Sequence, residues 1–182
     1  MQIPLRIIKN YIAATLSHGA DGVFYALDCA NLGFLTTEEF ETFGRWYDLE
    51  VLKAATAGWF NVLHIHGQGI MFDEVLSYPV QALNWHDSHA YPSIAQARGK
   101  TDLCFIGGLD ETGPLINGTP GDVISEVAAF LNQTNTRRVM LGPGCATSAN
   151  APEKNIGFFR LVLERFADKD IWRHLSEESA SL

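Results

Sequence analysis

Short apolar segments alternate with helical patterns along most of this 182-residue chain, and this alternation most restricts what the chain can fold into. Continuous apolar segments predict strands, and apolar residues at helical spacing predict the helices between them. The expected strands are residues 23–27, 59–65, 80–83, 103–106 and 139–141. The expected helices are residues 3–16, 36–55, 70–76, 93–97, 123–131 and 151–166. Strands that alternate with helices form a parallel sheet, so the predicted fold class is α/β.

The residues that end these strands favour a (β/α)8 barrel over a doubly wound sheet. Each apolar segment ends in a polar or metal-binding residue, and in a barrel the carboxyl ends of the strands form the active-site face. No G-x-G-x-x-G dinucleotide fingerprint follows an expected strand. A complete barrel needs eight strands and about 250 residues. We therefore predict a partial TIM (β/α)8 barrel of about five βα units, a single domain over residues 1–182 with a tail at 168–182.

Charge and cysteine content exclude several kinds of partner and cellular setting. A formal net charge of −8 without a basic patch argues against a nucleic-acid partner. No apolar run reaches the roughly 18 residues that a membrane span requires, so we expect no membrane partner. Three cysteines form an odd set without the spacing of a disulfide scaffold, which favours a cytoplasmic protein.

Two short segments at expected strand ends carry the donors of a candidate zinc site. His64 and His66 lie two residues apart, so a strand directs both side chains to one face. Cys145 follows a different strand, and three nitrogen or sulfur ligands with one open position are what a catalytic zinc site needs. The structural alternative is two histidines hydrogen-bonded at a strand end and an ordinary buried thiol.

Further polar residues and glycines end strands at the same expected edge. Asp28 and Asp110 are candidate catalytic residues, acting as general acids or bases or by orienting a ligating histidine, and helix or turn capping is the alternative. The expected substrate-binding residues are Cys29, Asn84, Gly107 and Gly108. The paired glycines would let the backbone approach a ligand or a neighbouring strand closely. His86 and His89 fall in a loop, where we expect solvated side chains outside the metal set.

Taken together and in order, these segments resemble the uroporphyrinogen decarboxylase superfamily, which includes heme-pathway decarboxylases and zinc-dependent methyltransferases that work with corrinoid proteins. The resemblance runs from about Gly19 to Ala167 and covers the later strands of the family barrel. It rests on Ala20-Asp21-Gly22 before a strand, His64-x-His66-Gly67, Tyr78-Pro79-Val80-x-Ala82-Leu83-Asn84-Trp85, Gly107-Gly108-Leu109-Asp110, and Pro143-Gly144-Cys145 followed by Pro152-Glu153-x-Asn155.

Two branches of the superfamily differ at these positions. The decarboxylase branch carries a serine where this chain has Cys29 and a histidine where this chain has Pro143. The essential arginine and aspartate of that branch come from early strands without counterparts here. The methyltransferase branch is more similar, although His66 stands where that branch has a cysteine. The resemblance therefore implies zinc held by His64, His66 and Cys145, activating a thiol for corrinoid-linked methyl transfer.

The resemblance and the incomplete barrel leave three function classes open. A zinc-assisted methyltransferase would act on a small-molecule, tetrapyrrole or corrinoid ligand. A uroporphyrinogen or other tetrapyrrole decarboxylase would need no metal cofactor, and a non-catalytic half-barrel would only bind a ligand. Because five strands of a closed barrel leave two open sheet edges, we also expect association. The expected form is a homodimer, with a missing N-terminal half supplied by another chain as the alternative.

Overall fold

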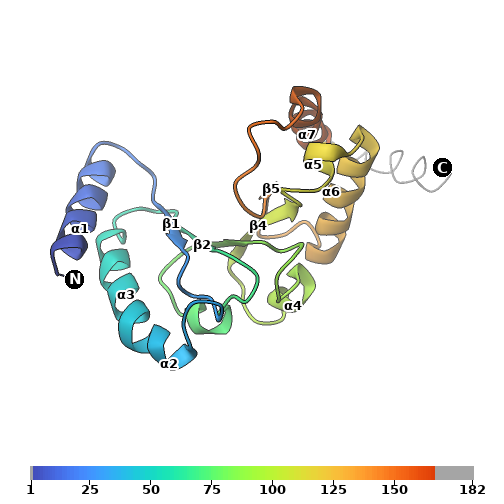
Figure 1. The fold of residues 1–182 in the computed structure, drawn as a ribbon. Helices are drawn as coiled ribbons and strands as arrows, with labels where there is room; N and C mark the ends of the chain where they lie inside the picture. Colours follow the sequence, from blue (N-terminus) through green and yellow to red (C-terminus); the bar gives the residue numbers. More distant parts are fainter. Residues whose placement is uncertain (1, 167–182) are drawn as a thin grey trace.

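The computed structural model describes residues 2–166, which form one parallel five-stranded sheet with helices packed against it (Figure 1). The strands are β1 (Phe24–Leu27), β2 (Val62–Ile65), β3 (Ala82–Trp85), β4 (Cys104–Leu109) and β5 (Val139–Pro143). The helical segments are α1 (Gln2–Ser17), α2 (Thr37–Phe40), η1 (Glu41–Arg45), α3 (Trp46–Ala54), η2 (Asp73–Val75), α4 (Ile94–Arg98), α5 (Pro114–Asn117), α6 (Pro120–Thr134) and α7 (Glu153–Phe166). The expected tail at 168–182 lies outside the described residues.

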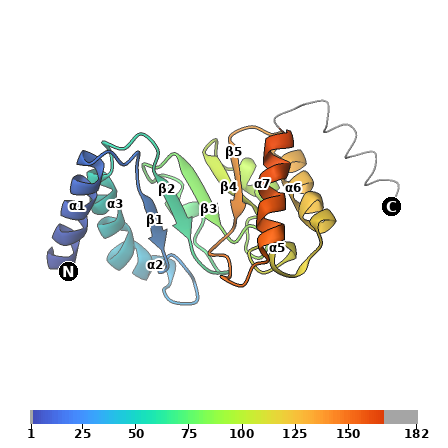
Figure 2. The ribbon, with the colours of Figure 1, turned by 90° about the horizontal axis from the view of Figure 1, so that it is seen from above.

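The order of the strands identifies the kind of α/β fold. Each strand pairs in parallel with the next one along the chain, giving the order β1-β2-β3-β4-β5. A (β/α)8 barrel winds in one direction in this way, whereas the strand order of a doubly wound sheet reverses. Figure 2 shows the strands side by side, with α1 packed against α3 at one end of the sheet and α7 packed against α6 at the other. The fold is a partial TIM barrel, as the sequence predicts.

Local sequence signals account for where two of the helices begin. Thr119 and Asp122 form a capping box at the start of α6, and Pro120 occupies its first turn. Thr36 and Glu39 form a second capping box at the start of α2. This helix continues through η1 into α3. The predicted helix at 70–76 is shorter, since only the 3₁₀ helix η2 forms there. Among the described residues, no helix is both long enough and apolar enough to cross a membrane.

The two faces of the sheet have different roles. One face packs against the helices and buries large apolar side chains, including those of Leu63, Ile65, Leu83, Trp85 and Phe105. The alternate positions face the other way and include a row that crosses the sheet in register: Ala26, His64, Asn84, Ile106 and Met140. This second face is the inner face of the partial barrel, and polar side chains from the middle strands lie on it.

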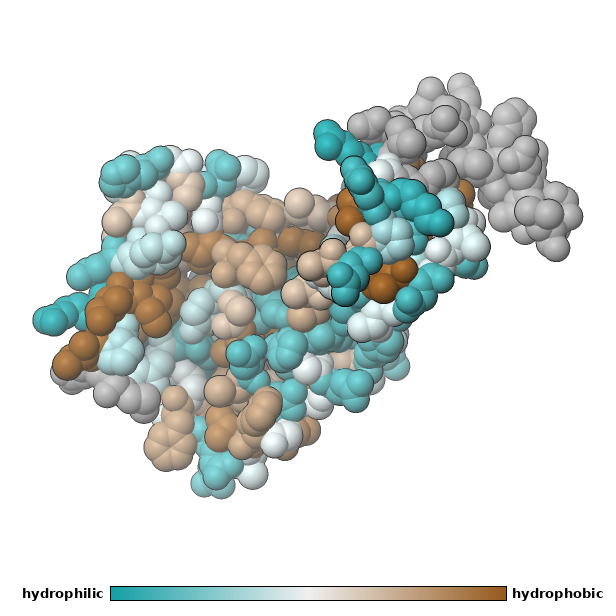
Figure 3. Space-filling model, turned by 45° about the horizontal axis from the view of Figure 1, so that its top comes forward, coloured by the Kyte–Doolittle hydropathy of each residue, from teal (hydrophilic) through white to brown (hydrophobic). Residues whose placement is uncertain are grey.

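The inner face is open at both edges of the sheet. Phe24 on β1 is 61% exposed and Met140 on β5 is 48% exposed, although both occupy inward positions. Figure 3 shows apolar surface in the hollow between the two groups of helices. An unpaired strand edge beside an exposed apolar surface favours association with another chain.

The predicted association can be tested at these edges. We expect light scattering to find a species larger than the 20.1 kDa monomer, and Phe24→Lys with Met140→Lys to shift it towards monomer, because a charge at each edge opposes strand pairing. Phe43→Lys is the matched control, since Phe43 is 59% exposed on η1 and not on the sheet. A well-folded monomer of the unmodified chain at micromolar concentration would contradict the prediction.

Candidate metal centre

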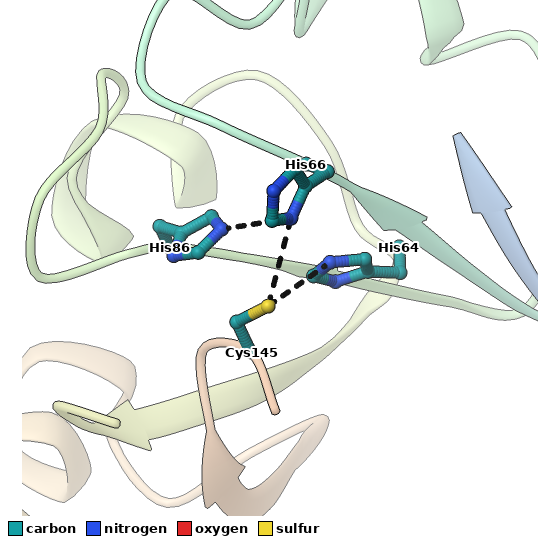
Figure 4. Close-up of side chains that lie close together, drawn as sticks. All are labelled: His64, His66, His86 and Cys145. Atoms are coloured by element: carbon teal, nitrogen blue, oxygen red, sulfur yellow. Dashed lines mark hydrogen bonds between the residues drawn. The ribbon is translucent and has the colours of Figure 1, made fainter. Parts of the chain in front are cut away.

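The three residues predicted as metal ligands come together at the carboxyl ends of β2 and β5. His64 lies on the inner face of β2, His66 follows the end of that strand, and Cys145 lies two residues beyond β5. The Cys145 Sγ atom is 3.7 Å from His64 Nε2 and 3.6 Å from His66 Nδ1 (Figure 4). The parallel sheet brings them together because it aligns the carboxyl ends of its strands at one edge.

His86 joins the group, so the expectation that it is solvated is wrong. Its Nε2 atom lies 3.2 Å from His66 Nδ1, and its side chain is only 15% exposed (Figure 4). A signal for this was present in the sequence. His86 lies two residues after Asn84, as His66 lies two residues after His64, and Asn84 pairs in register with His64. The same alternation therefore directs His86 to the position beside His66. His89 is exposed, as expected.

Three separations among the four potential donor atoms match those of a tetrahedral zinc site. His64, His66, His86 and Cys145 each offer one donor atom, and all four atoms lie within 4.8 Å of one another. Zinc bond lengths of about 2.3 Å to sulfur and 2.0–2.1 Å to nitrogen place tetrahedral S and N donors about 3.6 Å apart and two N donors about 3.3 Å apart. The measured separations of 3.6, 3.7 and 3.2 Å agree with these values. The donor set therefore fits zinc.

Asn84 orients His64 for metal binding. The Asn84 Nδ2 group donates to the backbone oxygens of Ile106 (2.8 Å) and Pro143 (3.1 Å), which leaves Oδ1 as the acceptor. Oδ1 lies 2.6 Å from His64 Nδ1, so this ring nitrogen carries the proton and donates it. The Nε2 atom then presents its lone pair towards Cys145. Asn84, predicted to bind substrate, thus holds a histidine in the tautomer that binds a metal.

Glu111 orients His86 in the same way. Its side chain is 6% exposed and follows β4, and Oε1 accepts a hydrogen bond from His86 Nδ1. His86 Nε2 therefore presents its lone pair towards His66 Nδ1. A carboxylate behind a histidine is a common arrangement at zinc sites, where it fixes the ring and raises its basicity. Nothing in the sequence distinguished Glu111 from the neighbouring Asp110.

Burial keeps His64 in the form that binds metal. Desolvation lowers the pKa of His64, and the nearby rings of His86 and His66 act in the same direction. The hydrogen bond with Asn84 and the charge of Asp28 oppose this effect without reversing it. His64 is therefore neutral at physiological pH, with a lone pair available for a cation.

The predicted catalytic aspartates lie outside the donor group. Asp28 is exposed in the loop after β1, and so is Cys29, which was predicted to bind substrate. Asp110 accepts hydrogen bonds from the Thr112 backbone (2.8 Å) and from His89 Nε2 (2.8 Å). These bonds and the partial charge of His89 outweigh burial and lower the pKa of Asp110. Asp110 thus caps a turn, and its predicted catalytic role stays a prediction.

Gly107 and Gly108 make room for protein side chains. A Cβ atom on Gly107 would lie 2.7 Å from Asp87 Oδ1, and one on Gly108, where φ is +89°, would lie 2.3 Å from the Phe130 ring. The Gly108 backbone N–H donates to Asp87 Oδ2 at 3.1 Å. Burial raises the pKa of Asp87 to about 6. The close backbone approach predicted at these glycines therefore takes place within the protein.

Comparison with known proteins places this geometry in a family. The sequence matches the family described as uroporphyrinogen decarboxylase (URO-D) over residues 1–165. The chain belongs to the URO-D family. No curated protein matches its sequence. Among solved structures it is similar to a methyltransferase from Methanosarcina mazei, with a TM-score of 0.78 and 18% sequence identity. The match covers 91% of this chain and 48% of that one, so this URO-D chain spans about half the length of its structural neighbour.

The role of Asn84 can be tested through metal affinity. We expect Asn84→Leu to weaken zinc binding about 10–100-fold, because His64 loses the acceptor that fixes its tautomer. A competition titration with a chromophoric chelator measures the change. Asn61→Leu is the matched control, since Asn61 is an equally buried asparagine at the opposite end of β2 and bonds the Val23 and Ala55 backbones. Equal zinc affinity in the two folded variants would contradict the role assigned to Asn84.

Proposed function

We propose that this URO-D family protein is a zinc-assisted methyltransferase that activates a thiol and receives its methyl group from a corrinoid donor. The observation that carries the proposal is the convergence of Cys145 Sγ with His64 Nε2 and His66 Nδ1 at 3.7 and 3.6 Å, the sulfur–nitrogen separations of a tetrahedral zinc site. The structural neighbour from Methanosarcina mazei is named a methyltransferase, which agrees with this branch of the family.

His64, His66 and Cys145 are the proposed zinc ligands. Zinc bound there would act as a Lewis acid that lowers the pKa of a substrate thiol and so supplies a thiolate nucleophile at neutral pH. Asn84 holds His64 in the required tautomer. A reducing, cytoplasmic setting is part of the proposal, because Cys145 is a free thiol and must stay reduced to bind metal.

His86 is assigned to the substrate side of the site. Catalytic zinc sites use three protein ligands and keep one position open, whereas four protein ligands form a closed structural site. His86 approaches the group from the fourth side, with Nε2 3.2 Å from His66 Nδ1. With Glu111 fixing its ring, Nε2 can accept a hydrogen bond from the S–H group of an incoming thiol. This contact would orient the sulfur among the ligands.

Zinc content is the first test. We expect the purified protein to contain about one zinc per chain by elemental analysis. Methyl transfer from methylcobalamin to a thiol should stop when a chelator removes the metal and return when zinc is restored. A protein without zinc, even after zinc is offered, would overturn the proposal. Tetrapyrrole decarboxylation that survives complete metal removal would assign the chain to the other branch.

Ligand variants separate the metal-binding residues from His86. We expect His64→Ala and Cys145→Ser to weaken zinc binding at least about 100-fold, because each removes a direct ligand. We expect His86→Ala to weaken it less than about 10-fold and to impair mainly the binding of the thiol. Thiol binding is followed by the visible spectrum of the cobalt-substituted protein. Loss of zinc in His86→Ala to the same degree as in His64→Ala would indicate a closed four-ligand site.

A further inference from the structure

His66 differs from the other two histidines of the donor group in the way it is held. Asn84 and Glu111 each fix the ring of one of the other two through its Nδ1 atom. The Nδ1 atom of His66 instead faces Cys145, and its Nε2 atom has no hydrogen-bond partner among the described residues. The position of this ring therefore depends on the backbone that carries it.

Both backbone polar groups of His66 are bound by residues at or just beyond the end of β1. Its N–H donates to the Leu27 oxygen at 3.1 Å, and its oxygen accepts a hydrogen bond from Asn31 Nδ2 at 3.1 Å. Asn31 is only 7% exposed, and a hydrogen bond is stronger there than in water. Its Oδ1 atom accepts from the Gly33 N–H at 2.8 Å. Only one orientation of the amide satisfies both bonds, because a flip would place donor against donor and acceptor against acceptor.

Backbone pairing keeps Asn31 beside the residues that follow β2. Asn31 and Ile70 form an isolated antiparallel bridge between the two loops. Two backbone hydrogen bonds of 2.8 Å flank it, one donated by the Leu32 N–H and one by the Met71 N–H. Ile70 and Met71 are both buried, so moving this loop away from His66 would leave buried backbone groups unpaired.

Three glycines leave the space that the Asn31 amide occupies. A Cβ atom on Gly67 would lie 2.1 Å from Asn31 Nδ2. A Cβ atom on Gly33 would lie 3.1 Å from Asn31 Oδ1, and one on Gly69 would lie 3.2 Å from it. Gly67 also has a φ of +97°, a conformation that residues with a side chain rarely adopt. Because Gly67 directly follows His66, its missing side chain is what lets the amide reach the His66 oxygen.

We propose that Asn31 is a positioning residue of the metal centre, which holds the backbone of His66 so that its Nδ1 atom faces Cys145. This inference rests on the proposed zinc-binding function and adds a residue to it. The hydrogen bonds of the Asn31 side chain go to backbone groups, so it acts through His66 and not as a ligand. A histidine with a fixed backbone has only its side-chain torsions left to order when metal binds, which lowers the entropic cost of binding.

Asn31→Asp tests this role, because the carboxylate can still accept the Gly33 N–H bond but has no N–H to donate to the His66 oxygen. We expect zinc affinity to fall about 10–100-fold in a competition titration with a chelator. The added negative charge by itself attracts zinc, so charge cannot produce this loss. Asn61→Asp is the matched control and should leave zinc affinity unchanged. Asn61 is also buried, and its amide likewise donates to one backbone oxygen and accepts one backbone N–H.

A double-mutant cycle shows whether the effect passes through His66. In the His66→Ala background, Asn31→Asp should change zinc affinity less than about 3-fold, because the residue that Asn31 positions is no longer a ligand. A purely structural role would give the same loss in both backgrounds. Asn31→Ser is the second variant should Asn31→Asp not fold, since its hydroxyl can accept the Gly33 N–H while the amide donor is lost.

The outcomes distinguish this inference from the proposed function. Unchanged zinc affinity in a folded Asn31 variant, or an equal loss in Asn61→Asp, overturns the role of Asn31 while the zinc-binding function stands. A loss that persists in full in the His66→Ala background does the same. Failure of the unmodified chain to bind zinc overturns the proposed function, and the role of Asn31 with it.

Discussion

The side chain of Asn84 connects the sheet to the metal centre. From β3 it bonds to a histidine on β2 and to backbone oxygens of Ile106 on β4 and Pro143 on β5. One amide group thus fixes the spacing of four strand ends and the tautomer of His64. A buried amide with every bond satisfied is rigid, and any displacement would leave polar groups unpaired at substantial cost. The positions of Cys145, beyond β5, and of His64 both depend on this contact.

Residues just beyond the strand ends are also held by groups from neighbouring strands. His86 follows β3 directly and is held by Glu111, which follows β4, so neighbouring strands again supply a donor and its support. Five strands are therefore enough to bring together four side chains that could hold a metal ion, because these side chains and their hydrogen-bond partners come from contiguous strands.

The sequence predicted the fold and three of the four side chains that meet at the strand ends, but it missed His86 and its partner Glu111. The alternation of strands and helices was sufficient for the sheet, because each strand pairs with the next one along the chain. His86 was placed in a loop, although the two-residue alternation from Asn84 continues to it past the end of β3. Glu111 could not have been selected, since Asp110 beside it carries the same charge and only the turn decides which carboxylate faces inward. The separation of Asn84 from His64 by twenty residues likewise hid their hydrogen bond.

The sequence alone determined the winding of the sheet, the edge at which functional residues gather, and the face to which His64 and His66 point. These properties follow from local periodicity and from the parallel pairing that βα units impose. The tertiary structure decided which groups meet: the approach of Cys145 to two histidines, the orientation of both supported rings, and the turn that withdraws Asp110. These contacts require atoms of residues far apart in the chain to lie within 3.7 Å of one another. Only the packed sheet sets such distances.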